Sequence, residues 1–171
     1  MKTKVIAALL LTSLSAGFAA MPKVGDTAPA FAGLDQDGKS VGLADFAGQK
    51  NVLLYFYPKD FTGGCTKEAC GFRDRMTDLQ TNNVQVVGVS FDAVDTHKRF
   101  IEKYNLTFPL IADTNGVITE AYGVKMPIMD LDKRVSFLIG KDGKILHVTD
   151  AMNPQVHFNE MQAAIAALNQ K

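Results

Sequence analysis

Two long apolar runs dominate the hydrophobic pattern of this chain. Residues 51–57 (NVLLYFY) and 84–91 (VQVVGVSF) contain no charged side chain. Such runs are typical of strands that are buried on both faces of a sheet. Between them the apolar spacing changes to that of an amphipathic helix. The stripe of this helix consists of Cys65, Ala69, Phe72, Met76 and Leu79. Strand, helix and strand in this order indicate a layered α/β fold.

The rest of the chain continues the alternation of strands and helices. The expected elements are a helix at 95–104 with Asp95 as N-cap, an edge strand at 107–112, a short helix at 115–122, strands at 134–140 and 144–149, and a last helix that begins at Asn153. An Asp-Gly turn at 35–38 predicts a small N-terminal β-hairpin before them. The order is hairpin, then β-α-β-α-β-α, then β-β-α. It indicates an α/β class with a thioredoxin-like fold, in which helices flank a central mixed sheet.

The N-terminal segment has the parts of a secretory signal peptide. Lys2 and Lys4 precede an apolar stretch at residues 5–14, and small residues follow it. The apolar stretch is shorter than the ~20 residues that span a bilayer. This length favours cleavage over a retained membrane anchor.

We therefore expect a signal peptide at residues 1–19, cleaved after Ala19 or Ala20, and a single domain at residues 20–171. The mature protein would be exported to the periplasm, with no stable membrane association. Composition fits an ordinary globular domain, because 47% of the 171 residues are hydrophobic and 21% are charged. Lys and Arg number 18, as do Asp and Glu, so the charge balance implies no nucleic-acid partner.

Both cysteines lie where the first buried strand passes into the helix. Cys65 follows Gly63 and Gly64 at the first turn of the predicted helix. Unpaired N–H groups and the positive end of the helix dipole favour a thiolate there, and the thiolate is the nucleophilic form. The glycines allow the backbone to approach a small substrate. A buried structural thiol, or half of a static disulfide, explains Cys65 equally well at this point.

The spacing of the second cysteine changes that balance. Cys70 lies five residues after Cys65. In a regular helix this spacing separates the two Cα atoms by roughly 8–9 Å, beyond the ~7 Å that a disulfide spans. A bond between them would unwind the first turns of the helix. The spacing therefore favours a redox cycle with local unfolding over a static disulfide.

Four further residues are candidates for the site. Thr62 suits a helix N-cap, and its hydroxyl can also bind a substrate oxygen. Pro58 ends the strand and would shield a thiolate from water. Glu68 lies one turn into the helix, where it can cap the helix or orient a cationic partner. Arg134 begins a later strand; near Cys65 it would hold the thiolate, and otherwise it is an ordinary surface residue.

These residues form a known motif. Pro58-x-x-x-Thr62-x-x-Cys65 matches the P-x-x-x-T/S-x-x-C signature of peroxiredoxins, and residues 55–74 resemble the bacterioferritin-comigratory, or Q-type, subfamily. The resemblance runs from about Lys23 to the C-terminus and includes RVSFLIGKDGKI, in which the first residue matches the active-site arginine of the family. It departs at the Gly-Gly pair before the cysteine, where the family often has Pro-Gly.

The resemblance implies reduction of hydrogen peroxide and organic hydroperoxides. Cys65 would be the peroxidatic nucleophile and become a sulfenic acid, and Cys70 would resolve it to an intramolecular disulfide. A thioredoxin-like or other dithiol would reduce this disulfide. No metal or organic cofactor takes part, and the subfamily is often monomeric. The histidines have the spacing neither of metal ligands nor of a Cys-His dyad, and we interpret them as surface or packing residues: His97, His147 and His157.

Two alternatives remain. An exported thioredoxin-like thiol-disulfide oxidoreductase would suit the compartment, but such enzymes use Cys-x-x-Cys, and this chain has four residues between its cysteines. Insulin reduction, compared with reaction with hydrogen peroxide, distinguishes this alternative. A non-enzymatic binding domain with a structural disulfide is the second alternative. Easy reduction of that disulfide with a gain of helix argues against it.

Overall fold

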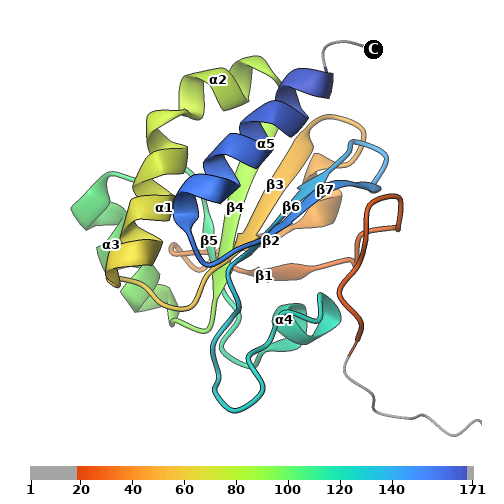
Figure 1. Ribbon diagram of the computed structural model, residues 1–171. Coiled ribbons are helices and arrows are strands. Elements are labelled where there is room, and N and C mark those ends of the chain that lie inside the picture. Colours follow the sequence, from red (N-terminus) through yellow and green to blue (C-terminus); the bar gives the residue numbers. More distant parts are fainter. Residues whose placement is uncertain (1–18, 169–171) are drawn as a thin grey trace, which may run out of the picture.

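The computed structural model describes residues 19–168, and a five-stranded sheet organises them (Figure 1). The strand order β5-β4-β3-β6-β7 places β3 (Asn51–Phe56) at the centre. On one side β4 (Val84–Ser90) and β5 (Leu110–Ala112) extend the sheet in parallel. On the other side β6 (Val135–Ile139) pairs antiparallel with β3, and β7 (Ile145–Asp150) antiparallel with β6. The predicted central mixed sheet is confirmed.

Helices and a small hairpin cover the two faces of this sheet. The helical elements are η1 (Leu43–Phe46), a 3-10 turn, and the α-helices α1 (Gly63–Asp74), α2 (Met76–Thr81), α3 (Val94–Tyr104), α4 (Val117–Ala121) and α5 (Pro154–Leu168). β1 (Ala32–Leu34) and β2 (Ser40–Gly42) form the predicted antiparallel hairpin. α1, α2 and α5 lie side by side over one face, and the hairpin and α4 lie on the other (Figure 1). The thioredoxin-like arrangement expected from the element order is confirmed.

Side chains along β3 alternate between two hydrophobic cores, because successive residues of a strand point to opposite faces. Leu53 and Tyr55 lie in the core beneath α1 and α5. Leu54 and Phe56 lie in the core beneath α4 and the hairpin. All four side chains are fully buried. A strand with two buried faces has no polar positions, which explains the uninterrupted apolar run in the sequence.

The strand directions bring the ends of distant segments together. β3, β4 and β5 are parallel, so the segments that follow their carboxyl ends meet at one edge of the sheet. β6 runs the other way, with Val135 opposite Phe56. Arg134, which precedes Val135, therefore reaches the same edge, where α1 also begins. The topology alone carries Arg134 across the sequence to the neighbourhood of Cys65.

The single helix expected after Cys65 is divided. At Arg75 the backbone leaves the helical conformation (φ −102°, ψ 8°), and α1 ends there. The Arg75 guanidinium donates a hydrogen bond to the Gly71 carbonyl oxygen (3.0 Å) and lies 4.8 Å from the centre of the Phe158 ring. This bond satisfies the carbonyl that the break leaves without a helical donor. The side chain of Arg75 thus stabilises the break and ties it to α5.

The N-cap of α3 also differs from the expected one. The helix begins at Val94, with Ala93 in the extended conformation of an N-cap, so the prediction of Asp95 as N-cap is wrong. Asp95 lies inside the first turn, where a negative charge still complements the helix dipole. A sequence pattern does not separate these two positions, because helix starts vary by one or two residues.

The predicted signal peptide lies outside the described residues, apart from Ala19 at its end. Met21 packs against the core beneath α4. Across residues 19–168, no helix is both long enough and apolar enough to cross a bilayer.

The contact between α1 and α5 gives a first testable prediction. A Cβ atom added at Gly71 would lie 2.1 Å from the Phe158 ring, so Gly71→Ala should overpack this contact. We expect Gly71→Ala to lower the free energy of unfolding by about 1–3 kcal/mol, although alanine is the better helix former. At Gly63 in the same helix an added Cβ meets nothing within 4 Å, which makes Gly63→Ala the matched control. Denaturant unfolding measures both; equal stabilisation by the two variants would contradict the close contact.

Candidate active site

Cys65 lies in the first turn of α1, at the carboxyl-end edge of the sheet. The helix begins at Gly63 with Thr62 as N-cap, and its first internal bond joins the Thr66 N–H to the Thr62 carbonyl oxygen (2.9 Å). The N–H groups of Gly63, Gly64 and Cys65 therefore have no acceptor within the helix. The Cys65 side chain is only 1% exposed and lies in the core beneath α1. The thiol is thus buried next to several backbone donors.

The structure brings Arg134 and Glu68 to this thiol. A terminal nitrogen (Nη2) of Arg134 donates to Cys65 Sγ at 3.3 Å, and Nη1 donates to the Glu68 carboxylate. Arg134 is 5% exposed and Glu68 is fully buried. A buried guanidinium needs a charged partner, and here it has the carboxylate on one side and the sulfur on the other. Of the two roles considered for Glu68, the structure thus shows contact with a cation rather than helix capping.

Gly64 provides the room for this arrangement. A Cβ atom at position 64 would lie 3.1 Å from Nη2 of Arg134, so a side chain there would press on the guanidinium. At Gly63 the same atom would meet nothing within 4 Å. The two glycines that precede Cys65 are therefore not equivalent. Only the second lies against the cation that contacts the sulfur.

The charge on Glu68 depends on pH near neutrality. Burial raises the pKa of Glu68 to about 7, while Arg134 beside it acts to lower that pKa. Burial acts to lower the pKa of Arg134, but Glu68 and Cys65 outweigh it and raise that pKa. Arg134 hence stays charged. Below about pH 7 the Glu68 carboxyl becomes neutral. Arg134, which contacts the sulfur, then no longer has an anionic carboxylate as its other partner.

His157 is a buried residue next to Glu68. The sequence did not indicate this contact. Nδ1 of His157 lies 2.8 Å from the Ser136 hydroxyl and 3.7 Å from a Glu68 carboxylate oxygen. Its Nε2 lies 2.8 Å from the Ala151 carbonyl oxygen, which can only accept, so Nε2 carries a proton. Burial lowers the pKa of His157, although the Ala151 carbonyl opposes this shift. Of the surface and packing roles left open for His157, the structure shows the buried one. Its helical spacing to Met161, a residue of the buried stripe of α5, was a signal for burial.

Thr62 and Pro58 lie on the loop between β3 and α1. Thr62 occupies the N-cap position, but its side chain makes no capping bond. Its hydroxyl instead donates to the Lys59 carbonyl oxygen (3.0 Å). Because the hydroxyl proton is used in this way, the oxygen of Thr62 has lone pairs left to accept a bond. Thr62 is exposed and Pro58 is half-buried.

The same loop is held by a second buried histidine. His97 is fully buried, and its Nδ1 lies 2.8 Å from a carboxylate oxygen of Asp60. Sequence reasoning assigned His97 to the surface or to packing and did not single out Asp60. The helical spacing of His97 with Phe100, a core residue of α3, was a signal for burial. No sequence pattern indicated its pairing with Asp60.

Cys70 lies further along α1, and both cysteines are free thiols. Cys65 is buried and Cys70 is half-buried. Because both belong to one uninterrupted helix, a disulfide between them is incompatible with this conformation. Within residues 19–168, no group of three or more His, Cys, Asp and Glu side chains could hold a metal ion.

Comparison with known proteins agrees with this site. Residues 24–148 match the family described as AhpC/TSA. The chain is 45% identical over 141 residues to peroxiredoxin Bcp of Escherichia coli, covering 79% of this chain and 90% of that relative. It is 37% identical over 146 residues to the chloroplastic peroxiredoxin Q of Sedum lineare, covering 84% of this chain and 78% of the relative. The crystal structure of peroxidoxin BcpB from Mycobacterium tuberculosis superposes with a TM-score of 0.81 and 34% identity, covering 85% and 97% of the two chains.

A thioredoxin-like sheet with a buried thiol at a helix start, contacted by an arginine, defines a thiol-based oxidoreductase. The chain belongs to the AhpC/TSA family and is a peroxiredoxin of the Bcp or Q type, that is, a thiol-dependent peroxidase. The resemblance drawn from the motif around Cys65 is therefore confirmed. The comparisons give no support to the alternative of a thiol-disulfide oxidoreductase.

One buried carboxyl group near the site has an unusual environment. Asp132, two residues before Arg134, is fully buried, and neither carboxyl oxygen has a hydrogen-bond partner among the described residues. Burial raises the pKa of Asp132 to about 8; nearby Thr119 lowers it, while the charges of Asp113 and Asp92 raise it further. Asp132 is therefore a neutral acid at neutral pH.

This environment predicts how stability depends on pH. The pKa of Asp132 is higher in the folded chain than its ordinary value of 3.8, so the stability it contributes is present below that value and is lost as pH rises to about 8. The side chain in Asp132→Asn stays neutral at all these pH values. The free energy of unfolding of this variant, relative to that of the native chain, should therefore be higher at pH 8 than at pH 5 by at least about 1 kcal/mol. Asp130→Asn is the matched control, because Asp130 is 80% exposed. Denaturant unfolding at both pH values measures this gain. Equal pH dependence of the two variants would show that Asp132 is ionised in the folded state.

Proposed function

We propose that Cys65 is the peroxidatic cysteine and Cys70 the resolving cysteine of this peroxiredoxin, with hydrogen peroxide and organic hydroperoxides as substrates. One observation carries the proposal: the buried Cys65 sulfur lies 3.3 Å from an Arg134 guanidinium nitrogen. A permanent cation and the free N–H groups of a helix start both favour the thiolate. The thiolate is the form that attacks a peroxide.

The first chemical step transfers one oxygen to sulfur. The Cys65 thiolate attacks the terminal oxygen of the hydroperoxide, the S–O bond forms, and the O–O bond breaks. The remaining alkoxide or hydroxide leaves and takes up a proton to become an alcohol or water. Cys65 is thereby oxidised to a sulfenic acid, and the peroxide is reduced by two electrons. Arg134 and the backbone N–H groups stabilise the negative charge that develops on the peroxide oxygens.

Thr62 orients the substrate in this proposal. Its hydroxyl proton is donated to the Lys59 carbonyl oxygen (3.0 Å), so its oxygen would accept the O–H of the hydroperoxide. Arg134 would donate to the substrate. An acceptor and a donor placed in this way hold the peroxide with one defined orientation toward the sulfur. Pro58, half-buried at the start of the loop, would limit the access of water.

The second step requires α1 to open. The Cys70 thiol attacks the Cys65 sulfenic sulfur, the disulfide forms, and water leaves. Within the intact helix this bond cannot form, so the turns between the two cysteines must unwind first. α1 contains Gly63, Gly64 and Gly71, and each glycine weakens a helix by up to about 1 kcal/mol relative to alanine. An external thioredoxin-like dithiol then reduces the disulfide by thiol exchange.

The location and assembly of the protein belong to the same proposal. We propose that residues 1–19 are a signal peptide, that residues 20–171 are the mature domain, and that this domain is exported to the periplasm as a monomer. The basic start and short apolar stretch of the sequence support this proposal. The family match lies within the mature part, at residues 24–148. The reductant would then be a dithiol protein of that compartment.

Substitution of the two cysteines tests the proposed roles. Cys65→Ser should abolish peroxide consumption, because a serine hydroxyl at this place is far less nucleophilic than a thiolate. Cys70→Ser should consume one peroxide per chain and then stop turning over with a dithiol protein as reductant. Mass spectrometry after one equivalent of peroxide should show a Cys65–Cys70 disulfide in the native chain. Continued turnover in Cys65→Ser would remove Cys65 from the nucleophilic role, and full turnover in Cys70→Ser would remove Cys70 from the resolving role.

Substitution of the two glycines before Cys65 tests the role of Arg134, because only Gly64 lies against its guanidinium. Gly64→Ala places a Cβ atom 3.1 Å from the Arg134 guanidinium, so the cation should shift away from the sulfur. We expect the rate constant of the native Cys65 with hydrogen peroxide to fall about tenfold or more, because small misplacements of catalytic groups have large effects on rate. Gly63→Ala, with no neighbour within 4 Å of its Cβ, should retain most of the rate. If both variants react alike, the contact between Arg134 and Cys65 does not set the rate.

A further inference from the structure

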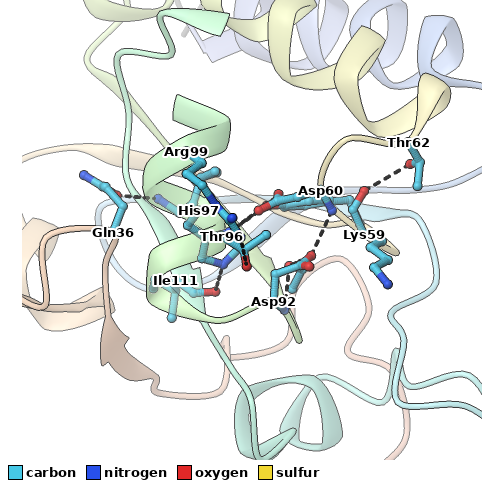
Figure 2. Close-up of polar contacts among 12 residues, drawn as sticks. Gln36, Lys59, Asp60, Thr62, Asp92, Thr96, His97, Arg99 and Ile111 are labelled. Atoms are coloured by element: carbon cyan, nitrogen blue, oxygen red, sulfur yellow. Dashed lines mark hydrogen bonds and ion pairs between the residues drawn. The ribbon is translucent and has the colours of Figure 1, made fainter. Parts of the chain in front are cut away.

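A buried hydrogen-bond network holds the loop between β3 and α1 at Asp60. Asp60 is 3% exposed, although it lies on a loop. One oxygen of its carboxylate accepts from the Tyr57 hydroxyl (2.7 Å), and the other lies 2.8 Å from Nδ1 of His97. Figure 2 shows Asp60 between His97 on α3 and Asp92 after β4. The Asp60 carboxylate bonds to Tyr57 and to α3, and the Asp60 backbone N–H bonds to the segment after β4, so this residue fixes the loop to the body of the domain.

The network extends to the peptide bond that orients Thr62. The N–H of Asp60 donates to Asp92 (2.8 Å), which also accepts from the Ser90 hydroxyl (2.9 Å). On the other side of the same peptide, the Lys59 carbonyl oxygen accepts from the Thr62 hydroxyl (3.0 Å). Both ends of this peptide are thus bonded (Figure 2). The direction of the Thr62 hydroxyl depends on the position of Asp60.

His97 is itself fixed in one orientation. Its Nε2 lies 3.2 Å from the Ile111 carbonyl oxygen on β5, which can only accept, so Nε2 carries a proton. Its Nδ1 faces the Asp60 carboxylate at 2.8 Å. The pair therefore connects the loop through α3 to the neighbouring strand. Both groups act on the site through the loop.

The residue between Asp60 and Thr62 has a strained backbone conformation. Phe61 has φ +61°, in the left-handed region that a bulky residue seldom adopts. Such a conformation costs of order 1–3 kcal/mol and persists only where the surroundings hold it. The Phe61 ring packs on Phe100 of α3 (centroids 5.1 Å apart), and Asp60 is bonded to the same helix. Loss of the Asp60 bonds would allow Phe61 to relax and Thr62 to move with it.

We infer that Asp60 and His97 form one positioning unit that sets the orientation of Thr62 toward the peroxide. The inference rests on the proposed roles of Cys65 and Thr62. The unit should affect the reaction with peroxide, which Thr62 orients, more than the reactivity of the thiolate, which Arg134 and the helix start stabilise. The ratio of two rate constants of Cys65 separates these effects. One is the rate constant with hydrogen peroxide, and the other is that with iodoacetamide.

The test uses the full chain with Asp60→Ala and Asp60→Asn. Competition against a peroxidase of known rate gives the constant for hydrogen peroxide, and mass spectrometry gives alkylation at Cys65. We expect Asp60→Ala to lower the ratio about tenfold or more. Asp60→Asn should stay within about threefold of the native ratio, because its amide still accepts from Tyr57 and can donate to Nδ1 of His97.

Asp113→Ala is the matched structural control. Asp113 is a buried carboxylate (3% exposed) that accepts from the Thr119 N–H and hydroxyl at 2.7 Å each, in α4 rather than in the loop. It should lower stability and leave the ratio unchanged. A native ratio in Asp60→Ala, or an equal loss in Asp113→Ala, would overturn the inference. If the native chain itself does not react rapidly with peroxide, the proposed function fails instead.

A double-substitution cycle tests whether the two groups act together. His97→Leu removes the imidazole and keeps an apolar side chain of moderate size on α3. If Asp60 and His97 form one unit, the double variant Asp60→Ala, His97→Leu should lower the ratio no further than the more impaired single variant. Losses that multiply in the double variant would show two independent contributions. That result would overturn the unit, even if Asp60 alone proved important.

Discussion

The site depends on the contacts that the Arg134 guanidinium makes with Cys65 and Glu68. The guanidinium is almost fully buried, and it joins Glu68 in the middle of α1 to the sulfur of Cys65 at the start of α1. A buried cation with one carboxylate partner holds its position only when the surrounding geometry is fixed. That geometry comes from the antiparallel pairing of β6 with β3, which sets the start of β6 beside the end of β3. The sheet therefore positions the charge beside the sulfur of Cys65.

In the proposed mechanism the same helix is ordered for one step and open for the next. Ordered α1 gives the thiol its backbone donors and its arginine, and opened α1 would let the two cysteines meet. The glycines of α1 weaken the helix, while the contact of Arg75 and Gly71 with Phe158 holds its far end against α5. Weak helix propensity with firm packing at one end favours opening from the end that carries Cys65. Opening of this kind would not require the whole domain to unfold.

Local sequence patterns predicted most of the fold but only part of the site. The strand that became β3 and the start of α1 at the Gly-Gly pair are readable because strand burial and helix periodicity act over a few neighbouring residues. The motif around Cys65 could be found for the same reason, since its residues lie within one turn and one loop. The break at Arg75 was missed because a side-chain bond and a ring on α5 stabilise it. The pairing of His97 with Asp60 was missed because it joins residues 37 positions apart.

Burial of a polar residue is visible in a helical pattern, but its partner is not. His97 and His157 both lie on the apolar stripes of their helices, so the periodicity carried the information that they are buried. Which group satisfies each imidazole is decided by the strand order and by the direction in which the strands run. The same limit applied to Arg134, whose place beside Cys65 follows from the register of β6 on β3. Here the family resemblance, rather than any periodicity, supplied the expectation.

Two groups of buried polar contacts divide the site. In the proposed cycle the start of α1 moves, whereas the loop before it stays fixed. Arg134, Glu68 and His157 surround the first turns of α1, whereas Asp60 and His97 hold the loop that ends at Thr62. The boundary between them falls at Gly63, which is exposed and whose missing side chain would meet no neighbour within 4 Å. Unwinding of α1 would thus pivot at Gly63 and carry the sulfur away from Arg134, while the loop keeps its bonds to α3 and β4. Because the loop would not be remade in each proposed cycle, Thr62 would stay oriented, and closing the helix would have to restore only the contact between Arg134 and Cys65.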